Sequence, residues 1–353
     1  NITFANVGTS SFSIIKSSGT LSVSASDGYG DDASQVVASK VQNFSDLPSP
    51  AINDMVVEVT GDASNSFDNY YVQYDSADDV WNETVAPSTK TTIDKDLMPH
   101  VLIRTADGNF RFTQVDGSTY TLSGTDYTVP EWGLRVCGDE KSAPDPSFIG
   151  KKINDIFFHR NRLGILADEN VIMSRSGEFF QFFTETATDA LDTDPVDVAS
   201  TAKKVSILRS AISFDEDLLL FTDQTQFMLT GGTTLTAGNV SINTSTEYET
   251  STGCKPIGAG SNVFFPFNKG NYTGIKLASA TNENILVALS SDTSSHNCLY
   301  VYQYYLQDGR RLQSAWHKWD FGTSSTDKIL NIDFIENTLY IVNQRGTNVF
   351  LES

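Results

Sequence analysis

Four aspartates lie within nine residues of this chain, at Asp189, Asp192, Asp194 and Asp197. Carboxylate oxygens are ligands that Ca²⁺ prefers, so a calcium loop is one interpretation of the spacing. An EF-hand loop also needs glycine at its sixth position and glutamate at its twelfth, and this segment has neither. We therefore predict no metal site. We expect a solvated acidic loop whose charges repel one another, or a loop that faces a channel or a neighbouring subunit.

Acid–base catalysis is not indicated by any particular pair of residues. In a chain with 44 acidic residues, at least one pair of carboxylates is expected by chance at the distance that glycosidases use. Such a pair alone is therefore no evidence for catalysis. Glu131, Glu178 and Glu185 lie near aromatic residues, whose apolar surroundings can raise the pKa of a carboxyl group, but nothing in the sequence singles one of them out as a general acid. His100, His159 and His317 are predicted to serve packing or an interface, and the sequence contains no Gly-x-Ser-x-Gly motif. We predict that the chain is not an enzyme.

Cofactor-binding motifs are also missing from the sequence. There is no Walker loop and no Gly-x-Gly-x-x-Gly, so no phosphate cradle is predicted. Cys137, Cys254 and Cys298 are widely spaced and include no Cys-x-x-Cys pair, which excludes a zinc signature, and we expect buried or half-buried thiols. We expect no cofactor.

Local basic spots interrupt an otherwise acidic chain with 24 Lys and Arg, 44 Asp and Glu, and a net charge of −20. They are Lys151-Lys152, Arg160-Asn161-Arg162 and Arg310-Arg311. Contact with nucleic acid is one interpretation, but a chain this acidic is poorly suited to hold phosphates. We favour pairing with carboxylates of a neighbouring sheet or subunit. Trp316 and Trp319 are three residues apart, which predicts opposite faces of a strand, with one ring in a core and the other at an interface.

The composition favours short strands joined by polar turns. The chain of 353 residues has 31 Asp but only 13 Glu, and Asp competes with the backbone for hydrogen bonds and favours turns. Its 22 Phe suit strands. No apolar run approaches the roughly 18 residues of a membrane span, so no membrane insertion is predicted.

Strand patterns change in character along the chain and suggest three segments. Residues 1–45 are β-rich and are expected to continue from a part that precedes them. Residues 46–147 alternate strands with turns such as Asp107-Gly108, a strong hairpin signal, which predicts a small antiparallel β-sandwich or barrel. Residues 148–353 repeat short antiparallel meanders at intervals of roughly 35–55 residues, which is typical of propeller blades. The predicted fold is all-β, with an incomplete propeller.

Long sequence stretches are similar to one family. They are Gly61–Thr84, Met98–Phe112, Pro146–Phe183, Asp192–Ala199, Leu235–Thr250 and Trp316–Gly322. In this order they resemble the tail tubular protein B, or tail nozzle, family of podoviruses, the phages with short tails. One departure is the run Gly274–Ser279, where a longer connection is expected.

This resemblance implies a structural role in the virion after assembly in the host cytoplasm. The family forms a homohexameric tube below the adaptor ring, so the implied partners are further copies, the adaptor on the portal side and a tail fibre. Double-stranded DNA is expected to pass through without stable binding. Other parts of the family's longer chain are expected to close the propeller and to form a tip. The alternative function is a glycan-degrading or glycan-binding propeller of a phage tail, which would need an aromatic cleft.

Overall fold

The structure, a computed structural model, describes most of the chain between residues 37 and 353. The described residues are 37, 39–61, 69–200, 206–214, 216–251, 255–259, 262–266, 275–280, 285–290, 298–307, 310–321, 327–335 and 338–353. The segment predicted over 1–45 falls mostly outside them. Within the described residues the regular elements are strands and two short 3-10 turns, which confirms the all-β prediction. No described helix has the length and apolar character needed to cross a bilayer.

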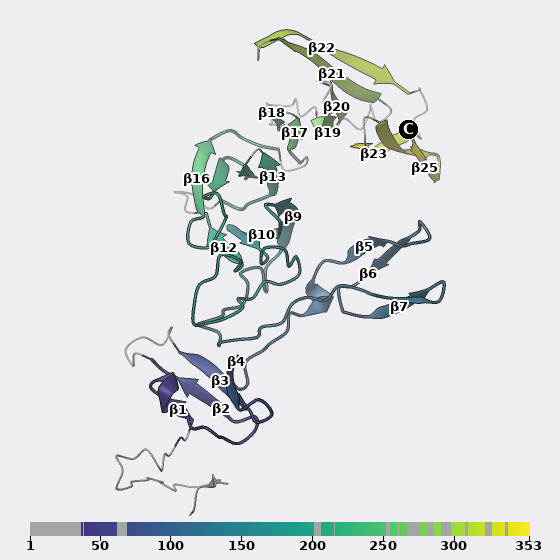
Figure 1. Ribbon diagram of the computed structural model, residues 1–353. Coiled ribbons are helices and arrows are strands. Elements are labelled where there is room, and N and C mark those ends of the chain that lie inside the picture. The colour runs from purple at the N-terminus through teal and green to yellow at the C-terminus, as the bar shows by residue number, and fades with distance from the viewer. Residues whose placement is uncertain are drawn as a thin grey trace, which may run out of the picture. The chain divides into compact units, whose positions relative to one another are not determined.

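The chain divides into two compact units, one with residues 1–149 and 174–195, the other with residues 150–173 and 196–353. The first unit contains a four-stranded sheet with the order β1-β2-β3-β4, in which only the β1–β2 pair is parallel (Figure 1). Its strands are β1 (Lys40–Val41), β2 (Val56–Val59), β3 (Tyr70–Asp75) and β4 (Val80–Thr84). Val57, Val59 and Val72 form its buried core because alternate residues of a strand share one face.

Two separate β-ribbons follow this sheet along the chain. One pairs β5 (Val101–Arg104) with β6 (Phe110–Thr113), and the other pairs β7 (Thr119–Leu122) with β8 (Thr125–Thr128). The predicted Asp107-Gly108 hairpin is confirmed, and Gly108 has a φ of 85°, which favours glycine. The second ribbon was not predicted. The sandwich or barrel arrangement of this unit stays a prediction.

Much of the remaining first unit is irregular backbone around aromatic side chains. The Trp132 ring packs edge-on against Phe180, and the Phe148 ring packs edge-on against Phe182. Arg135 is only 2% exposed and lies against the Phe183 ring. Side chains, rather than strand ladders, therefore organise this region.

The second unit consists of consecutive antiparallel sheets. The first two are β9 (Ile153–His159), β10 (Arg162–Ala167), β11 (Asn170–Met173) and β12 (Val196–Ala199), then β13 (Ser210–Phe214), β14 (Asp217–Phe221), β15 (Gln226–Thr230) and β16 (Ser241–Thr246). A small pair follows, with β17 (Ile257–Ala259) and β18 (Asn262–Phe264). The last two are β19 (Ile275–Ala280), β20 (Ile285–Ser290), β21 (Cys298–Gln307) and β22 (Arg310–Asp320), then β23 (Lys328–Ile335), β24 (Thr338–Arg345) and β25 (Asn348–Glu352).

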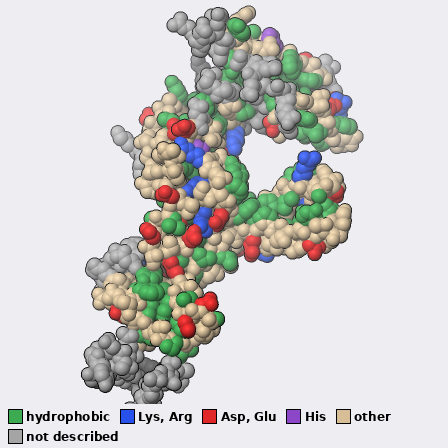
Figure 2. Space-filling model, viewed as in Figure 1, with side chains coloured by type: hydrophobic (Ala, Val, Ile, Leu, Met, Phe, Trp, Pro, Cys, Tyr) green, Lys and Arg blue, Asp and Glu red, His purple; other side chains and the backbone are tan. Residues whose placement is uncertain are grey.

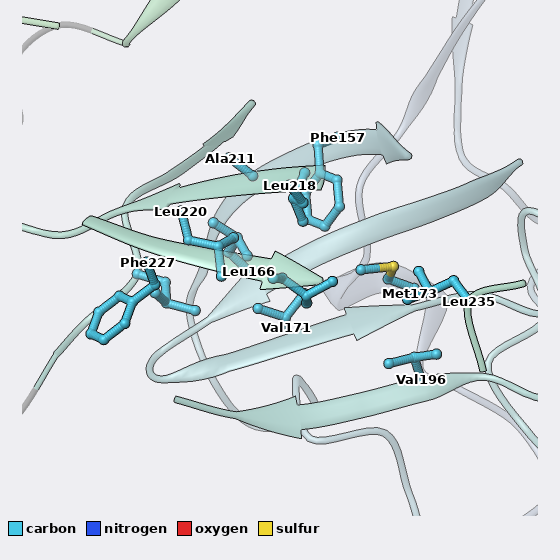
Figure 3. Close-up of a cluster of buried hydrophobic side chains, with 12 residues drawn as sticks. Phe157, Leu166, Val171, Met173, Val196, Ala211, Leu218, Leu220, Phe227 and Leu235 are labelled. Atoms are coloured by element: carbon cyan, nitrogen blue, oxygen red, sulfur yellow. The ribbon is translucent and has the colours of Figure 1, made fainter. Parts of the chain in front are cut away.

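The first two sheets of this unit share one hydrophobic core (Figure 3). Phe157, Leu166 and Val171 from the first sheet pack with Leu218 and Phe227 from the second. These side chains are at most 7% exposed, so each sheet depends on its neighbour to exclude water. The apolar character of β14 agrees with this packing, since a strand buried by neighbouring sheets needs apolar side chains on both faces.

Some predicted strand limits were wrong. The sequence pattern over Val171–Arg175 predicts a strand of that length, but the strand ends at Met173, because the chain leaves the sheet for residues 174–195 and returns as β12. The pattern over Val205–Ser213 likewise predicts a strand, and the strand found there, β13, begins at Ser210. β12 and β16 were missed, so the three strands that the sequence pattern predicts in each of the first two meanders become four.

Candidate assembly and channel residues

The four predicted aspartates do not have equivalent surroundings. Asp194 is only 5% exposed, and its Oδ2 accepts a hydrogen bond from the backbone N–H of Leu191 at 2.8 Å. The Asp194 N–H donates to the Leu191 carbonyl at 3.1 Å, which closes the same turn from both sides. Asp194 therefore stabilises the loop, and the prediction that all four carboxylates are solvated was wrong at this position.

The other three aspartates are exposed. Asp189 and Asp192 lie on the irregular segment of the first unit, and Asp197 lies on β12 of the second. Asp197 accepts a long hydrogen bond of 3.3 Å from the side chain of Asn170 on the adjacent strand. Among the described residues, no group of three or more His, Cys, Asp or Glu side chains could hold a metal ion.

The loop that carries Asp189 is held from the sheet of its own unit. The carboxylate of Glu83 on β4 accepts hydrogen bonds from Thr186 Oγ1 at 2.6 Å and from the Ala187 N–H at 2.7 Å. Glu185 pairs with Arg175, which also pairs with Glu178 at 3.1 Å. Two of the carboxylates considered as general acids are thus engaged with one guanidinium. The third, Glu131, lies in a β-bridge with Asp116.

The basic spot at Arg160–Arg162 joins two sheets of the second unit. Arg160 and Asn161 form the β9–β10 turn with φ of 45° and 60°, a left-handed conformation that non-glycine residues seldom adopt. The Arg160 side chain donates to the Glu216 carbonyl at 2.9 Å and to the Gly232 carbonyl at 2.6 Å. Arg162 is 1% exposed and donates to the Leu235 carbonyl at 3.1 Å. These arginines bind backbone carbonyls of the neighbouring sheet, a role that leaves Arg162 out of reach of nucleic acid.

The remaining basic spots are only partly described. Lys151 and Lys152 are exposed, and Lys151 Nζ lies 3.3 Å from Asn170 Oδ1 and 3.9 Å from Asp168 Oδ2. Arg310 and Arg311 begin β22, and their side chains lie outside the described residues.

The histidines have packing contacts of the predicted kind. The His159 ring is 4% exposed, and its Nδ1 lies 2.8 Å from Ser213 Oγ on the neighbouring sheet. Burial lowers the pKa of His159 to about 4, and the positive charge of Arg160 acts in the same direction. This imidazole is neutral near pH 7, and the contact is a cross-sheet hydrogen bond. His100 stacks on Phe112, and His317 Nε2 lies 3.0 Å from Gln303 Oε1.

The tryptophans and cysteines agree in part with the prediction. Trp316 and Trp319 pair with Tyr302 and Leu299 and therefore lie on opposite faces of β22. They are 50% and 44% exposed, so the expectation that one ring is buried in a core was wrong. Cys137 and Cys298 are buried free thiols, whereas Cys254 lies outside the described residues. Burial raises the pKa of Cys137.

Two features were not found by sequence reasoning. Buried Arg135 donates through Nε to the Ala143 carbonyl at 2.8 Å, through Nη1 to the Lys90 carbonyl, and through Nη2 to Asp145 at 2.7 Å. The second is an exposed apolar face of the β5–β6 ribbon. Alternation along Val101–Arg104 signals a strand, but it does not show that one face of the ribbon lacks a sheet to cover it.

Known structures with low similarity include virginiamycin B lyase from Staphylococcus aureus, 13% identical, with 83% of this chain and 89% of that chain covered at a TM-score of 0.35. Hsv2 from Kluyveromyces lactis is 8% identical, with 66% and 67% covered at a TM-score of 0.33. TM-scores this low do not identify a shared fold.

Sequence comparison gives a specific assignment. The tail tubular protein gp12 of Escherichia phage T7 is 34% identical over 354 residues, which cover 92% of this chain and 42% of that protein. The chain thus spans less than half of the length of this relative. The model of the bacteriophage nozzle protein family matches residues 1–279 and 275–353. The resemblance noted from the sequence is confirmed: the chain belongs to the bacteriophage nozzle protein family.

Proposed function

We propose that this chain is a structural part of the nozzle of a short phage tail. It forms a homohexameric tube below the adaptor ring, conducts DNA during ejection and supports tail fibres, and it resides in the virion after assembly in the host cytoplasm. The observation that carries this proposal is the family match along essentially the whole chain, together with the likeness to a tail tubular protein.

The architecture proposed for the tube has a small antiparallel β-domain over residues 46–147 and propeller-type blades over 148–353. Residues 1–45 continue from a preceding part. The succession of four-stranded antiparallel meanders that share cores supports the blade assignment. Further parts of the full-length protein complete the ring of blades.

The charge of the chain suits a conduit that must not retain DNA. Six copies at −20 each carry about −120 before counterions, and such a field repels phosphate. Repulsion reaches only about 8 Å at 0.15 M salt, so the acidic groups must lie at the lumen to act. We assign this role, or a position at a subunit contact, to the exposed Asp189, Asp192 and Asp197. DNA then passes without stable binding.

The test is the removal of the protein from its phage. Particles assembled without it should package DNA but lack the nozzle in electron micrographs and fail to eject. Restoring the protein in trans should restore both, and an antibody against it should label the tail. Fully infectious particles without the protein would contradict the proposal. Turnover of a glycan, nucleotide or ester that one carboxylate substitution abolishes would favour the enzymatic alternative.

A further inference from the structure

The β5–β6 ribbon carries a cluster of apolar side chains on one face. Directly paired residues of antiparallel strands share a face, and the pairs Leu102–Phe112 and Arg104–Phe110 therefore lie together. Leu102, Phe110 and Phe112 are 64%, 65% and 72% exposed. His100 stacks on the Phe112 ring with centroids 5.2 Å apart, which extends the same face. We call His100, Leu102, Arg104, Phe110 and Phe112 the ribbon face.

The opposite side of this ribbon already has a neighbour. Arg111, which pairs with Ile103, lies with its guanidinium carbon 4.6 Å from the centre of the Tyr120 ring on β7. Figure 2 shows hydrophobic side chains gathered along the arm that carries β5 to β8. An isolated two-stranded ribbon is at best marginally stable in water, so a ribbon with three such exposed side chains calls for a protein surface that covers them.

Charge indicates which surface that is. Within Val101–Thr113 the charged residues are Arg104, Asp107 and Arg111, and the one carboxylate is at the turn. Asp107 is occupied there, because its oxygens accept hydrogen bonds from Thr105 Oγ1 at 2.6 Å and from the Asn109 side chain at 2.9 Å. The ribbon face is thus apolar and cationic, whereas the chain as a whole carries −20. Another copy of this chain offers the complementary acidic surface.

We propose that the ribbon face docks on a different, acidic surface of a second copy, in a head-to-tail contact. A symmetric contact of the face with itself would bring together two faces that each carry Arg104 and no carboxylate, so like charges would meet without a partner. A head-to-tail contact avoids this repulsion, and repeated head-to-tail contacts close into a ring when the rotation between neighbouring copies is a whole fraction of a turn. Closure of the copies into a ring rests on the proposed function, in which the chain forms a tube. The contact between two copies itself requires neither DNA nor a phage particle.

The experiment measures the mass of the purified chain by sedimentation velocity over a range of concentrations. Wild-type protein should associate. Phe112→Ser should weaken the association by about 30-fold, as for the central side chain of an interface. Ile52→Ser is the control, because Ile52 is 49% exposed in the same unit but outside the ribbon face. Circular dichroism and the melting temperature show whether each variant is folded.

Two charge-reversal variants distinguish the effect of a charge on the ribbon face from the effect of the net charge of the chain. Both variants leave the apolar side chains unchanged. Arg104→Glu and Arg111→Glu change the same charge on opposite faces of the same ribbon. Arg104→Glu should weaken association by about 10-fold at low salt and by less at high salt, whereas Arg111→Glu should change it by less than about 3-fold. Phe110→Cys with an added oxidant should give no disulfide between the introduced thiols of two copies, because a head-to-tail contact keeps them apart.

Several results would overturn the inference. A wild-type chain that stays a single copy at every concentration, or equal effects of Arg104→Glu and Arg111→Glu, would exclude this face as a contact between copies. Rapid formation of the Phe110→Cys disulfide dimer would exclude the head-to-tail geometry. Antibody labelling of the tail tests the proposed function separately, so a labelled tail with a monomeric chain would reject only the contact.

Discussion

Protonation of one residue, His159, is expected to make the second unit less stable in acid. Its folded-state pKa of about 4 lies below the ordinary value of 6.5, so the unfolded chain binds more protons between these values. The contribution of neutral His159 to the free energy of unfolding is fully present above pH 6.5 and is lost as the pH falls toward 4. The difference between the two pKa values corresponds to roughly 3 kcal/mol at most. His159→Gln should reduce the slope of unfolding free energy against pH in this window.

The control for this prediction is His317→Gln. The His317 ring is exposed, so this substitution removes an imidazole that lies outside the buried contact between the two sheets. Denaturant unfolding at several pH values measures both variants. Wild-type and His159→Gln curves of equal slope between pH 4 and 6.5 would show that protonation of His159 does not oppose folding.

Arg135 should be a large contributor to the stability of the first unit. Arg135→Met retains much of the volume but leaves the Lys90 and Ala143 carbonyls and Asp145 without their buried donor. A buried acceptor that loses its donor typically costs about 1–3 kcal/mol, and Asp145 adds less because its side chain is 49% exposed. Arg209→Met is the comparison, because the exposed Arg209–Asp223 pair contributes about 0–1 kcal/mol. Similar denaturation midpoints for the two variants would contradict this ranking.

At the scale of elements, Gly164 on β10 leaves room for the ring of its cross-strand partner. A Cβ atom at Gly164 would lie 2.1 Å from Phe157 Cζ, and Phe157 belongs to the core of Figure 3. Gly164→Ala should therefore cost about 1–3 kcal/mol, because the ring must move within a packed core. Gly258→Ala on β17 is the matched control, since among the described residues its Cβ would meet only Ile212 Cγ2, at an ordinary contact distance of 3.7 Å. Unfolding of both variants by urea measures the difference.

Strands were predictable where their own residues carry the signal. Leu218–Phe221 is an apolar run between acidic turns, and it forms β14 as expected. Ser241–Thr246 is polar and exposed, and it becomes β16 only because β15 offers it a ladder. Burial of Arg135 and Asp194 was not predictable from local pattern. The Lys90 carbonyl that Arg135 binds lies 45 residues away in the sequence. The short spacing between the aspartates does not distinguish a solvated loop from a turn that an aspartate closes by a hydrogen bond.

At the scale of the molecule, the family could be identified from the sequence because stretches that resemble it occur in the same order along most of the chain. Contacts between copies could not be predicted from the sequence. Composition gives a net charge but no position for it. The structure refines the channel hypothesis, because Asp194 supports its own loop and only Asp189, Asp192 and Asp197 are exposed. A test that neutralises all four aspartates would mix a folding defect with a charge effect.

A test that avoids this mixture compares particles that carry Asp189→Asn, Asp192→Asn and Asp197→Asn together with particles that carry Asp194→Asn alone. The triple variant should fold and assemble normally, because exposed charges contribute little stability. It should eject DNA more slowly than wild type, most clearly near 0.01 M salt, where the Debye length reaches about 30 Å. Asp194→Asn weakens the turn at Leu191 and should lower the melting temperature without this salt dependence. Ejection rates measured against ionic strength distinguish exposed carboxylates that repel DNA from a buried carboxylate that supports its loop. Superimposable curves for the wild type and the triple variant would mean that Asp189, Asp192 and Asp197 do not act on the passing DNA.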